Sequence, residues 1–368
     1  MGKQVGVWVG CFGAGFKRRK SWLGEGSSVA KLILRAESLK AGIFAHLVRE
    51  TPPTRRDLLT TEHLPVETIT RLLDRSDYFV EMLRIPSPFQ KLRTLEGRTV
   101  ANLFFENSTR TRISFELAER RMGADHVTLT PSGSSMTKGE SVLDTVRVIE
   151  AMKVDAVVVR HSVSGVPGFL AGHLPTHVHV VNAGDGAHEH PTQALLDAAE
   201  LRAALGDLRG KRVVIVGDIL HSRVARSNVW LLKKFGAEVV LVGPSTLLPR
   251  HAEKVFGVEV SWKMDDALVK ADAVMMLRIQ MERMAGGFFP SLEDYSSRYG
   301  LSASGAGARR SASCVILHPG PVNLGVELDA EVSGGEQSLV LKQVKRGVAV
   351  RMAVLEWMFE SETSSRVE

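Results

Sequence analysis

Short apolar runs alternate with longer amphipathic segments along most of this chain, and this alternation limits the folds it can adopt. Eight runs have the character of buried strands; they are Gly97–Phe105, Val127–Thr130, Asp155–Arg160, His177–Asn182, Lys211–Gly217, Glu238–Val242, Ala271–Leu277 and Cys314–Leu317. The segments with helical periodicity are Leu64–Leu83, Arg110–Met122, Ser141–Met152, His190–Leu205, Val224–Phe235 and 338–360. Strands that alternate with helices predict parallel sheets, so we expect an α/β fold.

The alternation restarts near residue 205, which predicts two domains, each a parallel sheet flanked by helices. We place the first domain at residues 55–204 and the second at 205–337, followed by a C-terminal helix, 338–360, that packs back on the first domain. A chain of 368 residues is long enough for two domains of ordinary size. Ligands of open α/β sheets bind at the carboxyl ends of the strands, so we expect the active site in the cleft between the domains.

The N-terminal segment differs in charge from the rest of the chain. Residues 1–50 hold nine Lys or Arg and three Asp or Glu, whereas residues 51–368 hold 38 of each. The net charge of +6 therefore gives no support for a nucleic-acid-binding face on the body of the protein. We expect residues 1–54 to be a basic extension that is disordered or loosely helical. Its composition is compatible with a transit peptide, and a start codon assigned upstream of the true one is the explanation that we favour.

The two cysteines, Cys11 and Cys314, are too few for a disulfide framework or a four-cysteine zinc site. No apolar run approaches the roughly 20 residues that are needed to cross a bilayer. We therefore expect a cytoplasmic protein that binds neither membranes nor nucleic acid.

The richest chemistry follows the first strand, in Phe104-Phe-Glu-Asn-Ser-Thr-Arg-Thr-Arg112. The apolar run breaks at Glu106 and a helical pattern begins at once, which puts Ser108, Thr109, Arg110 and Thr111 on the first helical turn. Unpaired backbone N–H groups and the positive end of the helix dipole lie there. With two hydroxyl residues and a guanidinium added, this turn predicts a phosphate-binding site. The alternative is that Ser108 and Thr109 only cap the helix.

Polar residues also follow two later strands of the first half. Arg160 ends an all-apolar strand, which favours a role as a ligand group. His190 precedes Pro191 at a predicted helix N-terminus, where the dipole disfavours the charged imidazole, so a neutral histidine that hydrogen-bonds a carbonyl is expected. The run His188-Glu-His190 has poor spacing for metal ligation, so we expect no metal there.

The second half and one loop supply further cations. The segment after the fifth strand, Val216 to Arg226, lacks Gly-x-Gly-x-x-Gly, which disfavours nicotinamide binding. Arg223, Arg278 and Gln280 would together supply two guanidinium groups and an amide, a suitable set for two carboxylates. The loop from Ser134 to Glu140 carries a single lysine, Lys138, among hydroxyl and glycine residues, which is typical of a flexible loop that reaches a phosphate.

These motifs, in this order over residues 55–360, resemble the transcarbamoylase family, and within it the members that act on aspartate. Ser108-Thr-Arg-Thr-Arg112 is similar to the family's carbamoyl-phosphate signature, and His190-Pro-Thr-Gln193 and His318-Pro-Gly-Pro321 match two further motifs. The resemblance implies carbamoyl transfer from carbamoyl phosphate to L-aspartate, a step of pyrimidine synthesis, without a metal or organic cofactor. It makes residues 55–204 the carbamoyl-phosphate domain and residues 205–337 the aspartate domain.

The resemblance also implies roles for individual residues. Catalytic roles fall on Arg110, Thr111, Lys138, Arg160 and His190. Carbamoyl phosphate would be bound by Ser108, Thr109, Arg110, Thr111, Ser134, Lys138, Arg160, His190, Gln193, Gly320 and Pro321, and aspartate by Lys138, Arg223, Arg278 and Gln280. In the family, Ser134 and Lys138 would come from a neighbouring subunit of a homotrimer, sometimes with a regulatory or dihydroorotase partner.

One departure and two alternatives remain at this point. Many relatives have an arginine that helps to hold the closed state where this chain has Leu324, which puts the turnover rate in doubt. A non-catalytic assembly subunit with the same fold is one alternative. Ornithine carbamoyltransferase is the other, although Arg278 and Gln280 have the wrong charge pattern for an ammonium side chain.

Overall fold

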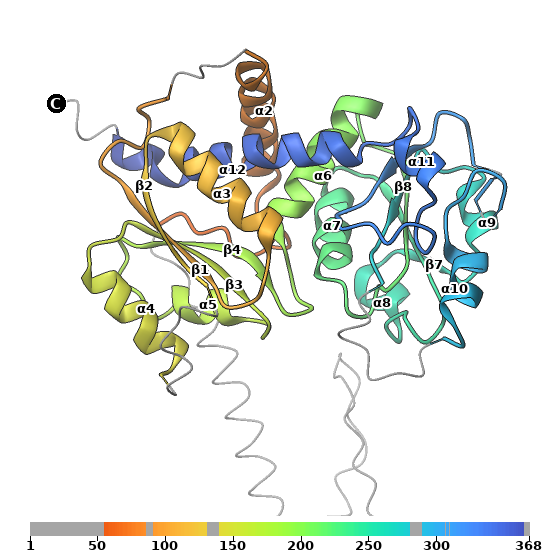
Figure 1. The fold of residues 1–368 in the computed structure, drawn as a ribbon, viewed down its shortest axis with the longest axis horizontal. Coiled ribbons are helices and arrows are strands. Elements are labelled where there is room, and N and C mark those ends of the chain that lie inside the picture. The colour runs from red at the N-terminus through yellow and green to blue at the C-terminus, as the bar shows by residue number, and fades with distance from the viewer. Residues whose placement is uncertain are drawn as a thin grey trace, which may run out of the picture. The chain divides into compact units, whose positions relative to one another are not determined.

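The computed structural model describes residues 55–85, 91–130, 140–279, 289–305, 307–308 and 310–363 (Figure 1). The expected disordered extension at residues 1–54 lies outside this part of the chain. The described residues form two parallel sheets, and helices flank each of them. The predicted α/β fold is therefore confirmed.

The first sheet has the strand order β2-β1-β3-β4, and every neighbouring pair is parallel. Its strands are β1 (Thr99–Phe104), β2 (Asp125–Leu129), β3 (Ala156–His161) and β4 (His179–Asp185). In β1 every residue after Thr99 is buried, and in β3 the run Ala156 to Val159 is buried. Burial on both faces explains why these strands are continuous apolar runs rather than alternating ones.

The second sheet has the order β7-β6-β5-β8-β9 and is also parallel throughout. Its strands are β5 (Arg212–Val216), β6 (Glu238–Val242), β7 (Glu259–Ser261), β8 (Ala273–Met276) and β9 (Val315–Leu317). Chain order reverses on either side of β5, as it does on either side of β1 in the first sheet. Such reversals open a crevice at the carboxyl ends of the strands.

The helices divide into long ones, which the sequence predicted, and short ones, which it did not. The long helices are α2 (Val66–Leu83), α3 (Thr109–Met122), α4 (Val142–Ala151), α6 (Pro191–Leu205), α7 (Arg223–Lys234) and α12 (Val340–Thr363). The short ones are α5 (Val166–Ala171), α8 (Ala252–Phe256), α9 (Met264–Leu268), α10 (Leu292–Tyr299) and α11 (Ala330–Gly334). Segments of five to eight residues are too short for helical periodicity to be recognised.

One hydrophobic core runs from the first sheet to the second. It takes in α2, α3 and α12 on one face of the first sheet, passes through α6 and α7, and reaches one face of the second sheet. Smaller clusters fill the other faces, under α4 and α5 in the first half and under α9 and α10 in the second. Helix α12, blue in Figure 1, packs against α2, α3 and α6.

No helix among the described residues has the length and hydropathy to span a bilayer.

Candidate active site

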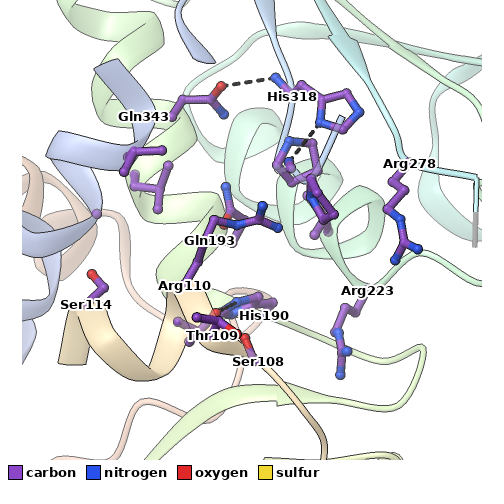
Figure 2. Close-up of a pocket in the computed structure, with 18 of the residues that line it drawn as sticks. Ser108, Thr109, Arg110, Ser114, His190, Gln193, Arg223, Arg278, His318 and Gln343 are labelled. Carbon is purple, nitrogen blue, oxygen red and sulfur yellow. Dashed lines mark hydrogen bonds between the residues drawn. The ribbon is translucent and has the colours of Figure 1, made fainter. Parts of the chain in front are cut away.

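A cavity of about 630 Å³ opens at the carboxyl ends of the strands of both sheets (Figure 2). All eleven predicted site residues that belong to the described part of the chain line it; they are Ser108, Thr109, Arg110, Thr111, Arg160, His190, Gln193, Arg223, Arg278, Gly320 and Pro321. The other three predicted residues, Ser134, Lys138 and Gln280, lie outside the described residues. Tertiary structure thus brings together residues that are up to 213 positions apart in the chain.

The first wall of the cavity is the N-terminus of α3. Ser108 is the N-cap residue with extended backbone angles, yet its side chain makes no capping hydrogen bond. Capping therefore does not account for the hydroxyl, and the open first turn faces the cavity with its backbone N–H groups. No acidic side chain occupies the first turn of α3, so its positive potential is not offset there.

Arg110 extends from this turn toward the His318–Pro321 segment, which follows β9 (Figure 2). A Cβ atom on Gly320 would lie 2.8 Å from the Arg110 Nη1 atom, and Gly320 has a φ of +66°. The left-handed backbone favours glycine at this position, and a Cβ atom there would displace the Arg110 guanidinium from its present place. Burial and the nearby positive charge of Arg278 lower the pKa of Arg110, which indicates that cations from the two halves of the molecule face one cavity.

Glu106, which sequence reasoning treated only as the end of a strand, joins two arginines across the cavity. Its carboxylate accepts two hydrogen bonds from Arg223, at 2.5 and 2.9 Å, and one from Arg160 at 3.4 Å. Arg223 begins α7 and Arg160 lies in β3, so the glutamate connects the two halves. Gly184 makes room for this cluster, because a Cβ atom there would lie 2.9 Å from Arg160 Nη1.

His190 is the N-cap of α6, and its imidazole is buried beside Thr111, with 3.5 Å between Nε2 and Thr111 Oγ1. Burial lowers its pKa well below the usual value, and the positive charges of Arg160, Arg351 and Arg223 lower it further. The expected neutral imidazole therefore has burial as its main cause rather than the helix dipole that the sequence suggested. Its backbone N–H donates to Ser227 Oγ at 2.8 Å.

The second wall combines Arg278, after β8, with the turn that follows β9. His318 is buried, and its Nδ1 accepts a hydrogen bond from the Gly320 N–H at 2.8 Å, which fixes the turn. Burial, with Arg110 and Arg278 nearby, lowers the pKa of His318 to about 3. The peptide bond between Gly320 and Pro321 is cis.

Helix α12 contributes two polar residues to the cavity that sequence reasoning missed, Gln343 and Arg351. Arg351 is buried, stacks over the Phe115 ring at 5.0 Å, and donates to Ser114 Oγ at 3.0 Å. Burial lowers its pKa to about 10. A signal was present in the sequence, because Arg351 interrupts an apolar run on the buried side of a long helix.

The His188-Glu-His190 run does not converge on a single point. His188 Nδ1 pairs with Asp185 Oδ2 at 3.0 Å, Glu189 accepts hydrogen bonds from Thr61 and Ser227, and His190 faces the cavity. Among the described residues, no group of three or more His, Cys, Asp or Glu side chains is arranged to hold a metal ion.

The charge of the cavity limits what it can bind. Among the described residues, its lining includes five arginines, Arg110, Arg160, Arg223, Arg278 and Arg351, and a single carboxylate, Glu106. The two lining histidines have lowered pKa values and add no charge near neutral pH. Guanidinium groups bind phosphate and carboxylate oxygens through paired hydrogen bonds. The cavity is therefore suited to a ligand or ligand pair with several anionic groups.

Comparison with known proteins identifies the family that this chain matches. The family described as aspartate/ornithine carbamoyltransferase matches in both of its domains, the carbamoyl-P binding domain over residues 56–203 and the Asp/Orn binding domain over residues 209–358. The aspartate carbamoyltransferase catalytic subunit of Gemmatimonas aurantiaca is 51% identical over 303 residues, which cover 82% of this chain and 93% of that protein.

Two solved structures agree with this result. Aspartate transcarbamoylase from Trypanosoma cruzi, in complex with carbamoyl aspartate and phosphate, has a TM-score of 0.71 and 29% identity, over 82% of this chain and 95% of that chain. The catalytic subunit of M. jannaschii aspartate transcarbamoylase has a TM-score of 0.71 and 32% identity, over 83% of this chain and 99% of that chain.

Proposed function

Because this chain belongs to the aspartate/ornithine carbamoyltransferase family, we propose that it transfers the carbamoyl group of carbamoyl phosphate to the amino group of L-aspartate. The products are N-carbamoyl-L-aspartate and phosphate. One observation carries this proposal: a cavity whose described lining includes five arginines and one glutamate, with an open helix N-terminus in its wall. Phosphate and the two carboxylates of aspartate are the anions that such a lining accommodates.

In this proposal the phosphate group binds at the N-terminus of α3. Ser108, Thr109 and Thr111 donate from backbone and hydroxyl groups, and Arg110 and Arg160 supply charge. Ser134 and Lys138 of a neighbouring subunit complete the phosphate site. Gly320 and Pro321 contact both substrates through the backbone of their turn.

The carbonyl end of the carbamoyl group lies toward Thr111, Arg160 and His190. The amine of aspartate attacks the carbonyl carbon, a C–N bond forms, and an oxyanion develops on the carbamoyl oxygen. Thr111, Arg160 and neutral His190 stabilise that oxyanion by donating hydrogen bonds. The C–O bond to phosphate then breaks, and the departing phosphate accepts the proton of the amine. Rate acceleration comes from positioning and charge stabilisation, with no protein nucleophile.

Aspartate binds on the opposite side of the cavity. Arg223 and Arg278 pair with its two carboxylates, and Gln280 and Lys138 add further hydrogen bonds. Arg223 is already engaged by the Glu106 carboxylate, in the paired geometry that a substrate carboxylate would use. Two arginines at this side favour aspartate over ornithine, whose side chain carries a positive charge.

The assembly we propose is a homotrimer in the cytoplasm, with active sites shared between subunits. A regulatory or dihydroorotase partner is compatible with this arrangement. The proposal of a shared site has a direct consequence: equal amounts of a Lys138→Ala variant and an Arg110→Ala variant, mixed after dissociation and reassociation, regain activity through hybrid sites.

The experiment that tests the function is carbamoyl transfer by the full chain, offered L-aspartate and L-ornithine in separate reactions. We expect carbamoyl-aspartate from aspartate and no product from ornithine. An Arg278→Ala variant should lose most of the aspartate activity. Arg298→Ala is the matched control, because Arg298 is 68% exposed and lies outside the cavity lining. Turnover of ornithine would overturn the aspartate assignment, and a folded chain without turnover of either amine would favour an assembly subunit.

A further inference from the structure

Asp197 lies behind the cavity, one turn along α6 from Gln193, and is fully buried. Its carboxylate accepts three hydrogen bonds, each from a side-chain amide. Gln193 Nε2 donates to Oδ1 at 2.8 Å, Gln343 Nε2 donates to Oδ1 at 2.7 Å, and Asn228 Nδ2 donates to Oδ2 at 2.9 Å. The three amides come from α6, α12 and α7, so this one carboxylate joins the helices that form the back of the cavity.

This convergence decides which way each amide is turned. An ionised carboxylate only accepts hydrogen bonds, whereas an amide has a donating NH₂ end and an accepting oxygen end. Each amide must therefore direct its NH₂ group at Asp197 and its oxygen away from it. For Gln343 the second half of this rule has an independent check, because its Oε1 accepts the backbone N–H of His318 at 3.0 Å (Figure 2).

For Gln193 the same rule leaves Oε1 on the side away from Asp197, and Gln193 is part of the cavity lining (Figure 2). Within the described residues no donor is bonded to this oxygen. Most of the charged lining consists of guanidinium donors, so an accepting oxygen at this point is chemically distinct from its surroundings. It is suited to an N–H donor on the bound ligand and unsuited to a methyl group in the same place.

We propose that Asp197 is a positioning residue that sets the donor specificity of the reaction by fixing the Gln193 oxygen toward the NH₂ group of carbamoyl phosphate. The inference rests on the proposed function and deepens it. Asp197 touches no substrate; it acts through Gln193. Carbamoyl phosphate presents an NH₂ where acetyl phosphate presents a CH₃, and the two are otherwise closely matched in size and charge. A fixed acceptor therefore favours the first and leaves the second with an unpaired buried oxygen.

Asp197→Leu tests this role at nearly constant shape. Gln193 and Gln343 share Oδ1, and Asn228 uses Oδ2. Leucine offers no accepting atom, so none of the three amides keeps its acceptor, and Gln193 is free to turn its NH₂ toward the cavity. The measurement is kcat/KM for carbamoyl phosphate and for acetyl phosphate at saturating aspartate. Acetyl phosphate reacts by the same displacement, giving N-acetyl-aspartate and phosphate. We expect the ratio of the two values to fall about tenfold, the factor that one hydrogen bond supplies.

Asn228→Ala is the matched control, because it removes another donor to the same carboxylate while leaving Gln193 bound to Asp197. It should lower stability and leave the ratio unchanged. A Gln193→Met variant removes the acceptor itself and should reproduce the tenfold fall, and Asp197→Leu added to it should change the ratio no further.

Three outcomes would overturn the proposal: equal losses with both acyl donors in Asp197→Leu, an unchanged ratio in Gln193→Met, or a further fall in the double variant. The Gln193→Met result keeps the proposal testable where Asp197→Leu does not fold. The wild-type chain separates this question from the reaction itself, because turnover of carbamoyl phosphate and aspartate by wild type supports the proposed function whatever the variants show.

Discussion

Glu119 offers a quantitative test of how α3, the helix that carries the proposed phosphate site, is fixed to its sheet. Its side chain has no exposed surface, and Oε2 accepts a hydrogen bond from Asn102 Nδ2 in β1 at 2.8 Å. Burial raises the pKa of this carboxyl from 4.5 to about 8, although the Asn102 hydrogen bond opposes the shift. Glu116 and Arg120 add smaller effects of opposite sign, and His126 Nδ1 lies 4.0 Å away. Glu119 is therefore protonated in the folded protein near neutral pH.

The raised pKa makes stability depend on pH in a definite direction. Between about pH 4.5 and 8 the folded state keeps the Glu119 proton that the unfolded state has lost. The stabilisation of the folded state that this proton provides is fully present below pH 4.5 and is lost as pH rises through about 8. Each pH unit in this window changes the free energy of unfolding by at most about 1.4 kcal/mol. Glu119→Gln replaces the neutral acid with a neutral amide and removes this dependence.

Urea unfolding of wild type and Glu119→Gln at pH 6, 7 and 8 measures the effect. Relative to wild type, the free energy of unfolding of Glu119→Gln should rise by up to about 3 kcal/mol over these two pH units. Glu81→Gln, a change at a carboxyl that is 64% exposed on α2, is the control and should run parallel to wild type. Parallel curves for Glu119→Gln as well would refute the argument that this carboxyl is buried in its neutral form.

Three further outcomes are expected. Histidine NMR signals should show His188 more than half protonated at pH 6.5, since its bond to Asp185 raises its pKa, and His190 neutral, since burial lowers its pKa; a charged His190 would contradict the site electrostatics. Glu327→Leu should raise KM for aspartate about tenfold, because it removes the buried carboxylate that accepts the N–H of Ile279, next to Arg278, at 2.7 Å; an equal rise in both KM values would refute it. Leu324→Arg should raise kcat without loss of stability, because Leu324 is 62% exposed; an unchanged kcat would remove the proposed role of arginine there.

Local patterns were sufficient for the fold class and for four of the five arginines in the described lining of the cavity. Strands buried on both faces appear as continuous apolar runs, and long helices show their period, so both could be recognised without tertiary information. Because parallel strands place their carboxyl ends at one edge, the polar residues after each run, such as Arg160 and Arg278, could be assigned to a common site. Short elements such as α8 and β7 were missed, since three to five residues carry too little periodicity.

What the sequence could not supply was the pairing of residues across the cavity. Glu106 appeared to be only a strand end, yet its carboxylate joins Arg160 and Arg223. Asp197 appeared to be one polar position in a helix, yet three amides from three helices converge on it.

The sequence by itself determined which residues are available at the strand ends, because chain-local spacing sets the secondary structure. Only the tertiary structure decided which of their atoms face one another. Hydrogen-bond direction, burial and the resulting pKa shifts depend on distances between elements that are far apart in the chain. The neutral state of His190 illustrates both parts: its place at a helix N-terminus was predicted, and the burial and three arginines that lower its pKa come from the fold.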